Sequence, residues 1–220
     1  DKGQGGEREY GDIDLRGWYF SYPQDAWKNK TYGSIENDAR YLYILEQILK
    51  TLDPSIREVI KVRELNNTYA IKLNHQEVII KDGKIADTDV LSSGTKAGLD
   101  ISYIIASIIC DRHDLYYCDE LFSYVNSEIE KACLSIIIEK LQGRKQLFFT
   151  THNTDILDMQ LPKHSFTFLK KDAADQEMPI KCISASKYLK RNTDCLKNAV
   201  ENDLFCTKPS LDRLYEIADL

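Results

Sequence analysis

The stretch Leu115-Tyr116-Tyr117-Cys118-Asp119-Glu120 decides the fold, because a short apolar run ends abruptly in two carboxylates. Such a run between polar segments is typical of a buried strand. Residues 96–110, which precede it, are apolar almost all round and predict a buried helix. Residues 127–141, which follow it, have apolar residues at helical spacing, and Ser127-x-x-Glu130 has the pattern of a capping box. A strand between two helices is typical of an α/β protein.

A second apolar strand is predicted at 146–150, beyond the glycine that ends the second helix, Gly143. Consecutive strands joined by a helix of this length pair in parallel through a right-handed crossover. We therefore predict an α/β fold built on a parallel sheet flanked by helices. A short helix at 154–160 and a strand at 165–169 are expected to complete this unit.

The region before this unit has a different pattern. Apolar residues from Ile35 to Leu52 recur on one helical face, and Asp53-Pro54 ends the run. Three short strand-like runs follow, separated by Asn-rich or Asp-Gly turns. They cover 59–62, 68–73 and 77–81. A helix followed by a small antiparallel β-meander is the expected structure.

The chain is thereby divided into four expected parts. They are an aromatic-rich peripheral segment at 1–34, a helix plus meander at 35–90, a lobe with the chemical motifs at 91–172, and a C-terminal edge strand (180–183) with helices at 173–220.

The composition is that of a globular protein, with 43% hydrophobic and 29% charged residues. A net charge of −6 argues against a surface that is wholly a polyanion clamp. No run reaches the roughly 20 apolar residues of a membrane span. This predicts no membrane partner. The six cysteines are spaced irregularly without a CxxC pair, which favours reduced thiols in a cytoplasmic protein.

Three motifs have residues suited to phosphate chemistry. Ser92-Ser93-Gly94-Thr95-Lys96 directly precedes the buried helix, where amides and the helix dipole favour an anion. Asp119 and Glu120 end one strand, where the first carboxylate suits Mg²⁺ and the second can accept a proton from water. His152 ends the next strand and can hydrogen-bond a phosphate. Taken singly, the three motifs are also explained as an ordinary N-cap, a solvated strand end and a structural histidine.

The order of these motifs resembles that of ABC-type ATPase heads. Leu91–Ala97 is similar to the LSGGEKA form of the ABC signature in structural-maintenance-of-chromosomes and RecF-like proteins, and Asp119-Glu120 matches the end of Walker B. Ser123-Tyr124-Val125-Asn126 falls at the D-loop, and Thr150-Thr151-His152-Asn153 resembles the switch segment of OLD-like AAA ATPases. The segment 162–172 also resembles the strand that follows this switch.

The resemblance implies that two heads enclose ATP and Mg²⁺ between them. Asp119 would hold Mg²⁺, Glu120 would polarise water and His152 would contact the γ-phosphate, with Asn126 in the D-loop. The signature residues would bind nucleotide held mainly by the opposing head; they are Ser92, Ser93, Gly94, Thr95 and Lys96.

The chain departs from the family at three places. No G-x-x-x-x-G-K-[ST] motif occurs, since the only Gly-Lys pair, Gly83-Lys84, is followed by Ile85. Ser93 replaces a signature glycine and Asn126 replaces the usual D-loop aspartate. Without the phosphate-binding loop, the 220-residue chain alone is predicted neither to bind ATP tightly nor to hydrolyse it.

Three functions remain open from the sequence. The OLD-like resemblance favours the ATPase of a nucleic-acid-linked or anti-phage defence complex that gates a nuclease or toxin partner. A transporter ATPase is the first alternative, and the LSGGEKA-like signature counts against it. A non-catalytic interaction module derived from an ATPase head is the second, and the retained Asp119, Glu120 and His152 count against it.

Overall fold

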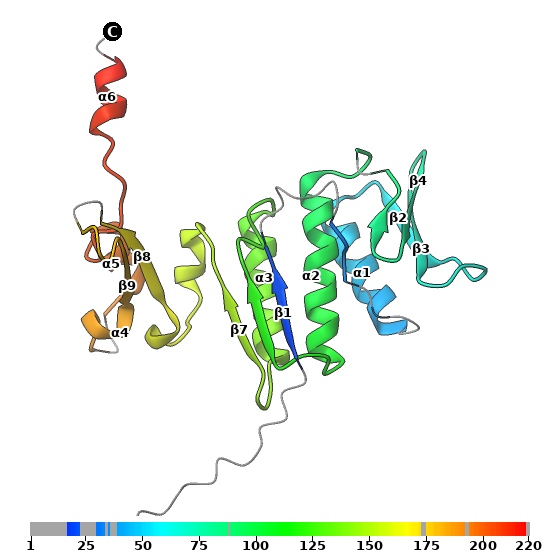
Figure 1. Ribbon diagram of the computed structural model, residues 1–220, viewed down its shortest axis with the longest axis horizontal. Helices are drawn as coiled ribbons and strands as arrows, with labels where there is room; N and C mark the ends of the chain where they lie inside the picture. The colour runs from blue at the N-terminus through cyan, green and yellow to red at the C-terminus, as the bar shows by residue number, and fades with distance from the viewer. Residues whose placement is uncertain are drawn as a thin grey trace, which may run out of the picture. The chain divides into compact units, whose positions relative to one another are not determined.

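In the computed structural model, three parallel strands form one sheet (Figure 1). Their order is β1 (Trp18–Ser21), β6 (Leu115–Cys118) and β7 (Gln146–Phe149). β6 pairs with β1 on one side and with β7 on the other, both in parallel. The predicted α/β class and its parallel sheet are therefore confirmed.

The structure describes residues 17–22, 30–33, 35, 39–87, 89–172, 175–191 and 194–218. These divide into two units, Asp1–Asn153 and Thr154–Leu220. All of the parallel sheet and all of the predicted site residues belong to the first unit.

Strand β1 differs from the expectation that residues 1–34 are a peripheral segment. Residues 18–21 instead form an outer strand of the central sheet, in register with β6 from Trp18↔Leu115 to Ser21↔Cys118. The strand escapes sequence analysis because it has only four residues and apolar side chains on both faces, so no period stands out. The rest of 1–34, apart from 17–22 and 30–33, lies outside the described residues.

Two helices cover one face of this sheet. The chain passes from β1 to β6 through α2 (Ser93–Ile109) and from β6 to β7 through α3 (Ser127–Lys140). Both crossovers step in the same direction along the sheet, so a right-handed connection places both helices on the same side. The hydroxyl of Tyr116 in β6 lies 3.0 Å from that of Ser107 in α2 and anchors this contact.

Aromatic side chains occupy the opposite face of the sheet. Phe20, Tyr117 and Phe148 are paired in register across the three strands. Phe20 is 43% exposed and Phe148 is 55% exposed. This face is thus far less covered than the face that α2 and α3 shield.

Helix α1 (Ala39–Leu52) and an antiparallel meander pack beyond α2; the helix and three strands are as predicted, and a short fourth strand, β5, is added. The strands are β2 (Ile56–Lys61), β3 (Thr68–Leu73), β4 (Glu77–Lys81) and β5 (Lys84–Ile85), in that order. α1 approaches α2 very closely at Gly98, where an added Cβ would lie 2.5 Å from Leu52 Cδ1. Alanine at this position would therefore force the side chain of Leu52 to move.

A buried ion pair joins α2 to the segment 30–33. The carboxylate of Asp100 is 1% exposed and accepts a hydrogen bond from Lys30 Nζ at 2.5 Å. Burial raises the pKa of Asp100, and the Lys30 ammonium opposes that rise. The other carboxylate oxygen, Oδ1, is buried without a hydrogen-bond partner. The buried charge of Asp100 therefore depends strongly on Lys30 for its stabilisation.

The second unit is built on a two-stranded antiparallel sheet. The strands predicted at 165–169 and 180–183 were expected to join the parallel sheet. Instead, β8 (Thr167–Lys171) pairs antiparallel with β9 (Ile180–Ser184). Only residues 172–179 connect them, whereas a parallel crossover needs about a dozen. The described residues of the unit also form two 3-10 helices, η2 (Thr154–Asp158) and η3 (Lys163–Ser165), and three short α-helices, α4 (Ala185–Tyr188), α5 (Leu196–Glu201) and α6 (Asp212–Ala218). Phe168 stacks on Phe205 in the core of this unit.

The six cysteines are free thiols in contrasting surroundings. Cys118 and Cys133 are buried in the first unit, and burial raises the pKa of Cys118 to about 12 and that of Cys133 to about 11. The three cysteines of the second unit are exposed; they are Cys182, Cys195 and Cys206. None of the helices within the described ranges combines the length and apolar character that a membrane span requires.

Candidate functional site

The acidic and histidine segments leave the sheet at the same edge. β6 and β7 are parallel neighbours whose last paired residues are Cys118 and Phe149. Backbone bonds extend past the strands, because Asp119 N–H donates to Ser21 O at 2.8 Å and Thr150 N–H donates to Cys118 O at 3.0 Å. The carboxyl ends of parallel strands are where such sheets bind ligands.

The hydroxyl of Thr150 links both acidic residues to β7. It donates to Asp119 Oδ1 at 2.6 Å and accepts from the backbone N–H of Glu120 at 3.0 Å. A hydroxyl can make both bonds because it has one proton and two lone pairs. Thr150 thus fixes the spacing between the two strand ends.

Glu120 turns sharply out of β6 and meets His152. Its φ is +46°, in the left-handed region that glutamate rarely adopts. In this conformation Glu120 Oε1 lies 2.6 Å from His152 Nε2, while Ser123 Oγ donates to Oε2 at 3.3 Å. The His152 side chain is 88% exposed and that of Glu120 is 36% exposed, so solvent reaches the pair.

The acidic end of β6 suits Mg²⁺ only with help from a ligand. No group of three or more His, Cys, Asp or Glu side chains that could hold a metal occurs among the described residues. Asp119 offers one carboxylate, of which Oδ1 is engaged by Thr150. Mg²⁺ typically binds one or two carboxylates together with substrate phosphates and water, so Asp119 fits magnesium that arrives with a nucleotide.

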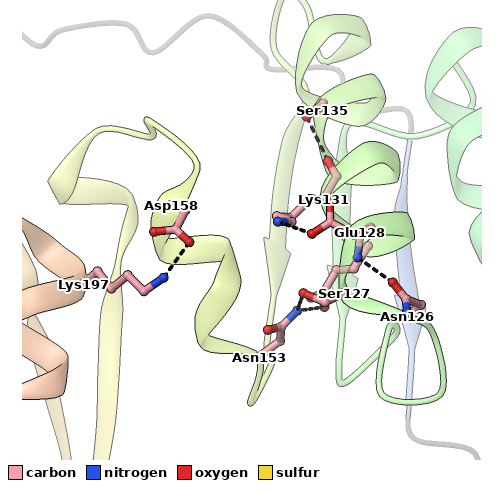
Figure 2. Close-up of polar contacts among 9 residues, drawn as sticks. Asn126, Ser127, Glu128, Lys131, Ser135, Asn153, Asp158 and Lys197 are labelled. Atoms are coloured by element: carbon pink, nitrogen blue, oxygen red, sulfur yellow. Dashed lines mark hydrogen bonds and ion pairs between the residues drawn. The ribbon is translucent and has the colours of Figure 1, made fainter.

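Residues that flank the histidine are tied to α3. Asn126, not Ser127, is the N-cap of this helix, and its side chain accepts from Glu128 N–H at 2.9 Å (Figure 2). The predicted capping box is therefore wrong.

Glu130 is 2% exposed and its carboxylate accepts from Thr151 Oγ1 at 3.0 Å and from Asn153 Nδ2 at 2.5 Å.

The signature segment forms the N-terminus of α2. Ser92 is the N-cap, and its hydroxyl oxygen accepts from Thr95 N–H at 3.1 Å and lies 2.7 Å from Thr95 Oγ1. Thr95 is fully buried and Lys96 is 8% exposed. These two side chains are therefore not accessible to a nucleotide, in contrast to the sequence prediction. Ser92 is exposed, and Ser93 and Gly94 are half-buried. Of the five predicted signature residues, Ser92, Ser93 and Gly94 are therefore the ones that solvent reaches.

Gly94 lies against the loop that follows the acidic residues. A Cβ added there would be 3.0 Å from the carbonyl oxygen of Tyr124, which is tighter than ordinary contacts. The loop also contains the N-cap Asn126, so the signature and D-loop segments touch. The residue expected in the D-loop thus has a structural role as a helix cap.

Sequence analysis missed two residues of the site. The sequence pattern places Thr150 only in the strand and the switch-like segment, and Glu130 only in a capping box. A hydroxyl directly after a β-strand, opposite a carboxylate on its parallel neighbour, was the available signal for Thr150. Glu130 gave no such signal, because a glutamate in the first turn of a helix is ordinarily exposed.

No model of a known protein family matches the chain, and a search of curated protein sequences gives no significant match.

Proposed function

We propose that this chain is the C-terminal part of an ABC-type ATPase head that binds and hydrolyses ATP with Mg²⁺. The observation that carries the proposal is the joint placement of Asp119, Glu120, Thr150 and His152 at one edge of a parallel sheet. A carboxylate pair and a histidine that flank one solvent-accessible point are suited to phosphoryl transfer to water.

Each side chain has a role that its surroundings favour. Asp119, held at Oδ1 by Thr150, binds Mg²⁺ that accompanies the nucleotide. Glu120 accepts the proton of the attacking water, and its position beside His152 directs its carboxylate towards solvent and phosphate. His152 donates to the γ-phosphate once the nucleotide separates it from Glu120. Mg²⁺ supplies the neutralisation of phosphate charge.

The proposed partner is a second head, because the signature-like segment at 91–97 would act on nucleotide that is held mainly by an opposing head. Ser92, Ser93 and Gly94, at the N-terminus of α2, supply hydroxyls and first-turn amides for the γ-phosphate across the interface. The head pair drives a nucleic-acid-linked or anti-phage defence complex in the cytoplasm, in which a nuclease or toxin is the effector. This part of the proposal rests on the OLD-like and RecF-like motifs alone.

The test is ATP turnover with and without a phosphate-binding loop. The chain alone is expected to show no steady hydrolysis of MgATP. After co-expression with a polypeptide that supplies the P-loop half of such a head, hydrolysis should appear. Glu120→Gln should then lower turnover by roughly 10²–10⁴-fold, the usual contribution of a general base, and leave ATP binding largely intact.

The matched control is Glu128→Gln, since Glu128 is an exposed glutamate of the same unit. It should leave turnover unchanged. Steady hydrolysis by the chain alone, or a Glu120→Gln complex that turns over at the wild-type rate, would remove these residues from the proposed mechanism.

A further inference from the structure

Glu130 occupies an unusual position for a glutamate in the first turn of a helix. It is 2% exposed, whereas Glu128, in the same turn of α3, has a side chain that is 79% exposed and pairs with Lys131. A buried carboxylate must be satisfied by hydrogen bonds, because burial without them is strongly unfavourable. The donors to Glu130 come from a different segment, the one that follows β7.

Those donors lie on either side of the candidate catalytic histidine. Thr151 donates to Glu130 Oε1 at 3.0 Å, and Asn153 donates to Oε2 at 2.5 Å. Asn153 also donates to Ser127 Oγ at 3.0 Å (Figure 2), and its backbone N–H donates to Thr151 Oγ1 at 3.0 Å. The backbone of His152 is therefore held to the start of α3 through both of its neighbours.

The His152 side chain itself has little to hold it. It is 88% exposed, and its contact with Glu120 is one hydrogen bond in solvent, which is weak support for a fixed orientation. The direction of the imidazole is then set mainly by the backbone conformation of residues 151–153. That conformation depends on the buried carboxylate of Glu130, which accepts hydrogen bonds from Thr151 and Asn153.

We propose that Glu130 is the positioning residue for His152. It orients the histidine towards Glu120 and the phosphate site through Thr151 and Asn153, without touching the substrate itself. The inference rests on the proposed function only for the role of His152, since the structural link between Glu130 and the segment stands without it.

The first experiment needs no nucleotide and uses the whole chain. Amide hydrogen exchange of residues 151–153 and the imidazole NMR signals of His152 are compared in wild type, Glu130→Gln and the control Glu128→Gln. Glutamine replaces an acceptor oxygen with a donor NH₂, so it cannot accept from both Thr151 and Asn153. We expect exchange of the Asn153 amide, which donates to Thr151 Oγ1, to rise about tenfold and the His152 signals to shift in Glu130→Gln, with neither change in Glu128→Gln.

Exchange of Leu134 and Ile137 in the buried part of α3 reports whether the variant keeps its fold. If Glu130→Gln does not fold, Asn153→Ala takes its place, because it removes one donor and leaves the helix sequence untouched; it should loosen the same residues. A folded variant in which His152 and residues 151–153 behave as in wild type would overturn the proposal.

The second experiment separates this inference from the ATPase itself. In the complex completed with a P-loop half, Glu130→Gln should lower kcat by roughly 10-fold or more with KM nearly unchanged, as expected for a lost transition-state contact. Absence of hydrolysis in the wild-type complex would defeat the proposed function and leave the exchange result standing. Hydrolysis with a kcat that Glu130→Gln does not alter would defeat the positioning role.

Discussion

The carboxylate of Glu120 and the imidazole of His152, 32 positions apart in sequence, meet at 2.6 Å where two parallel strands end. The contact exists because β6 and β7 are adjacent and in register up to Cys118 and Phe149. Two polar segments that look unrelated in the sequence thus form one site.

Thr150→Val should destabilise the first unit. The valine has nearly the same shape but removes the bond to the Asp119 carboxylate and leaves Glu120 N–H without its acceptor. A hydrogen bond to a charged group contributes about 1.5–3 kcal/mol. Urea unfolding should show a loss of this size, whereas Thr51→Val, at an exposed helix position, should stay within about 0.5 kcal/mol. Equal effects of the two substitutions would contradict the bridging role of Thr150.

Lys30→Met should unfold more easily at neutral pH than in acid. Breaking a buried pair leaves an uncompensated charge on Asp100, which typically costs about 3–5 kcal/mol. Burial raises the pKa of Asp100, so the folded state binds this proton more tightly than the unfolded state does. Its contribution to stability is therefore complete below the ordinary value of 3.8 and is lost as the pH rises through the raised value.

The Lys30 ammonium opposes the rise, so in Lys30→Met the pKa of Asp100 should be raised further. The pH range over which stability depends on Asp100 should then widen. Denaturant unfolding from pH 3 to pH 7 measures it. The double variant Lys30→Met/Asp100→Asn should recover much of the loss at pH 7 and lose the added pH dependence. A Lys30→Met penalty that is the same at every pH would argue against a charged Asp100 in the fold.

Five of the six cysteines should react in two groups. Cys182, Cys195 and Cys206 are exposed and should be alkylated by iodoacetamide at pH 8 in the native protein. Cys118 and Cys133 should stay unmodified until the chain unfolds, because burial both shields the thiols and raises their pKa values to about 12 and about 11. Mass mapping after short exposure measures this, and native labelling of Cys118 as fast as that of Cys182 would contradict the described core.

Much of the first unit follows from local sequence patterns. Periodicity and turn residues predict α1, α2, α3, the meander and strands β6 and β7, because each of these elements buries a regular set of side chains. β1 has too few residues for a period, and its place in the sheet depends on long-range pairing with β6. The pairing of β8 with β9 follows from the length of the connection between them, which pattern analysis of single strands does not weigh.

The candidate site was predictable only as a list of separate residues. Asp119, Glu120 and His152 could be chosen because polar groups follow buried strands. The burial of Thr95 and Lys96 could not be anticipated, since it depends on how α2 packs after its cap. The pairing of Glu130 with Thr151 and Asn153 likewise depends on tertiary placement, because local sequence equally permits a capping role.

The left-handed backbone conformation of Glu120 lowers the stability of the fold at the position of the proposed general base. Asparagine tolerates this conformation better, and relief of the strain is worth on the order of 1 kcal/mol. Glu120→Asn should therefore raise the melting temperature by a few degrees, whereas Glu120→Gln, with the same backbone preference as glutamate, should not. Stability alone does not explain an acidic residue with this backbone conformation, whereas the proposed role of Glu120 as a general base requires one there.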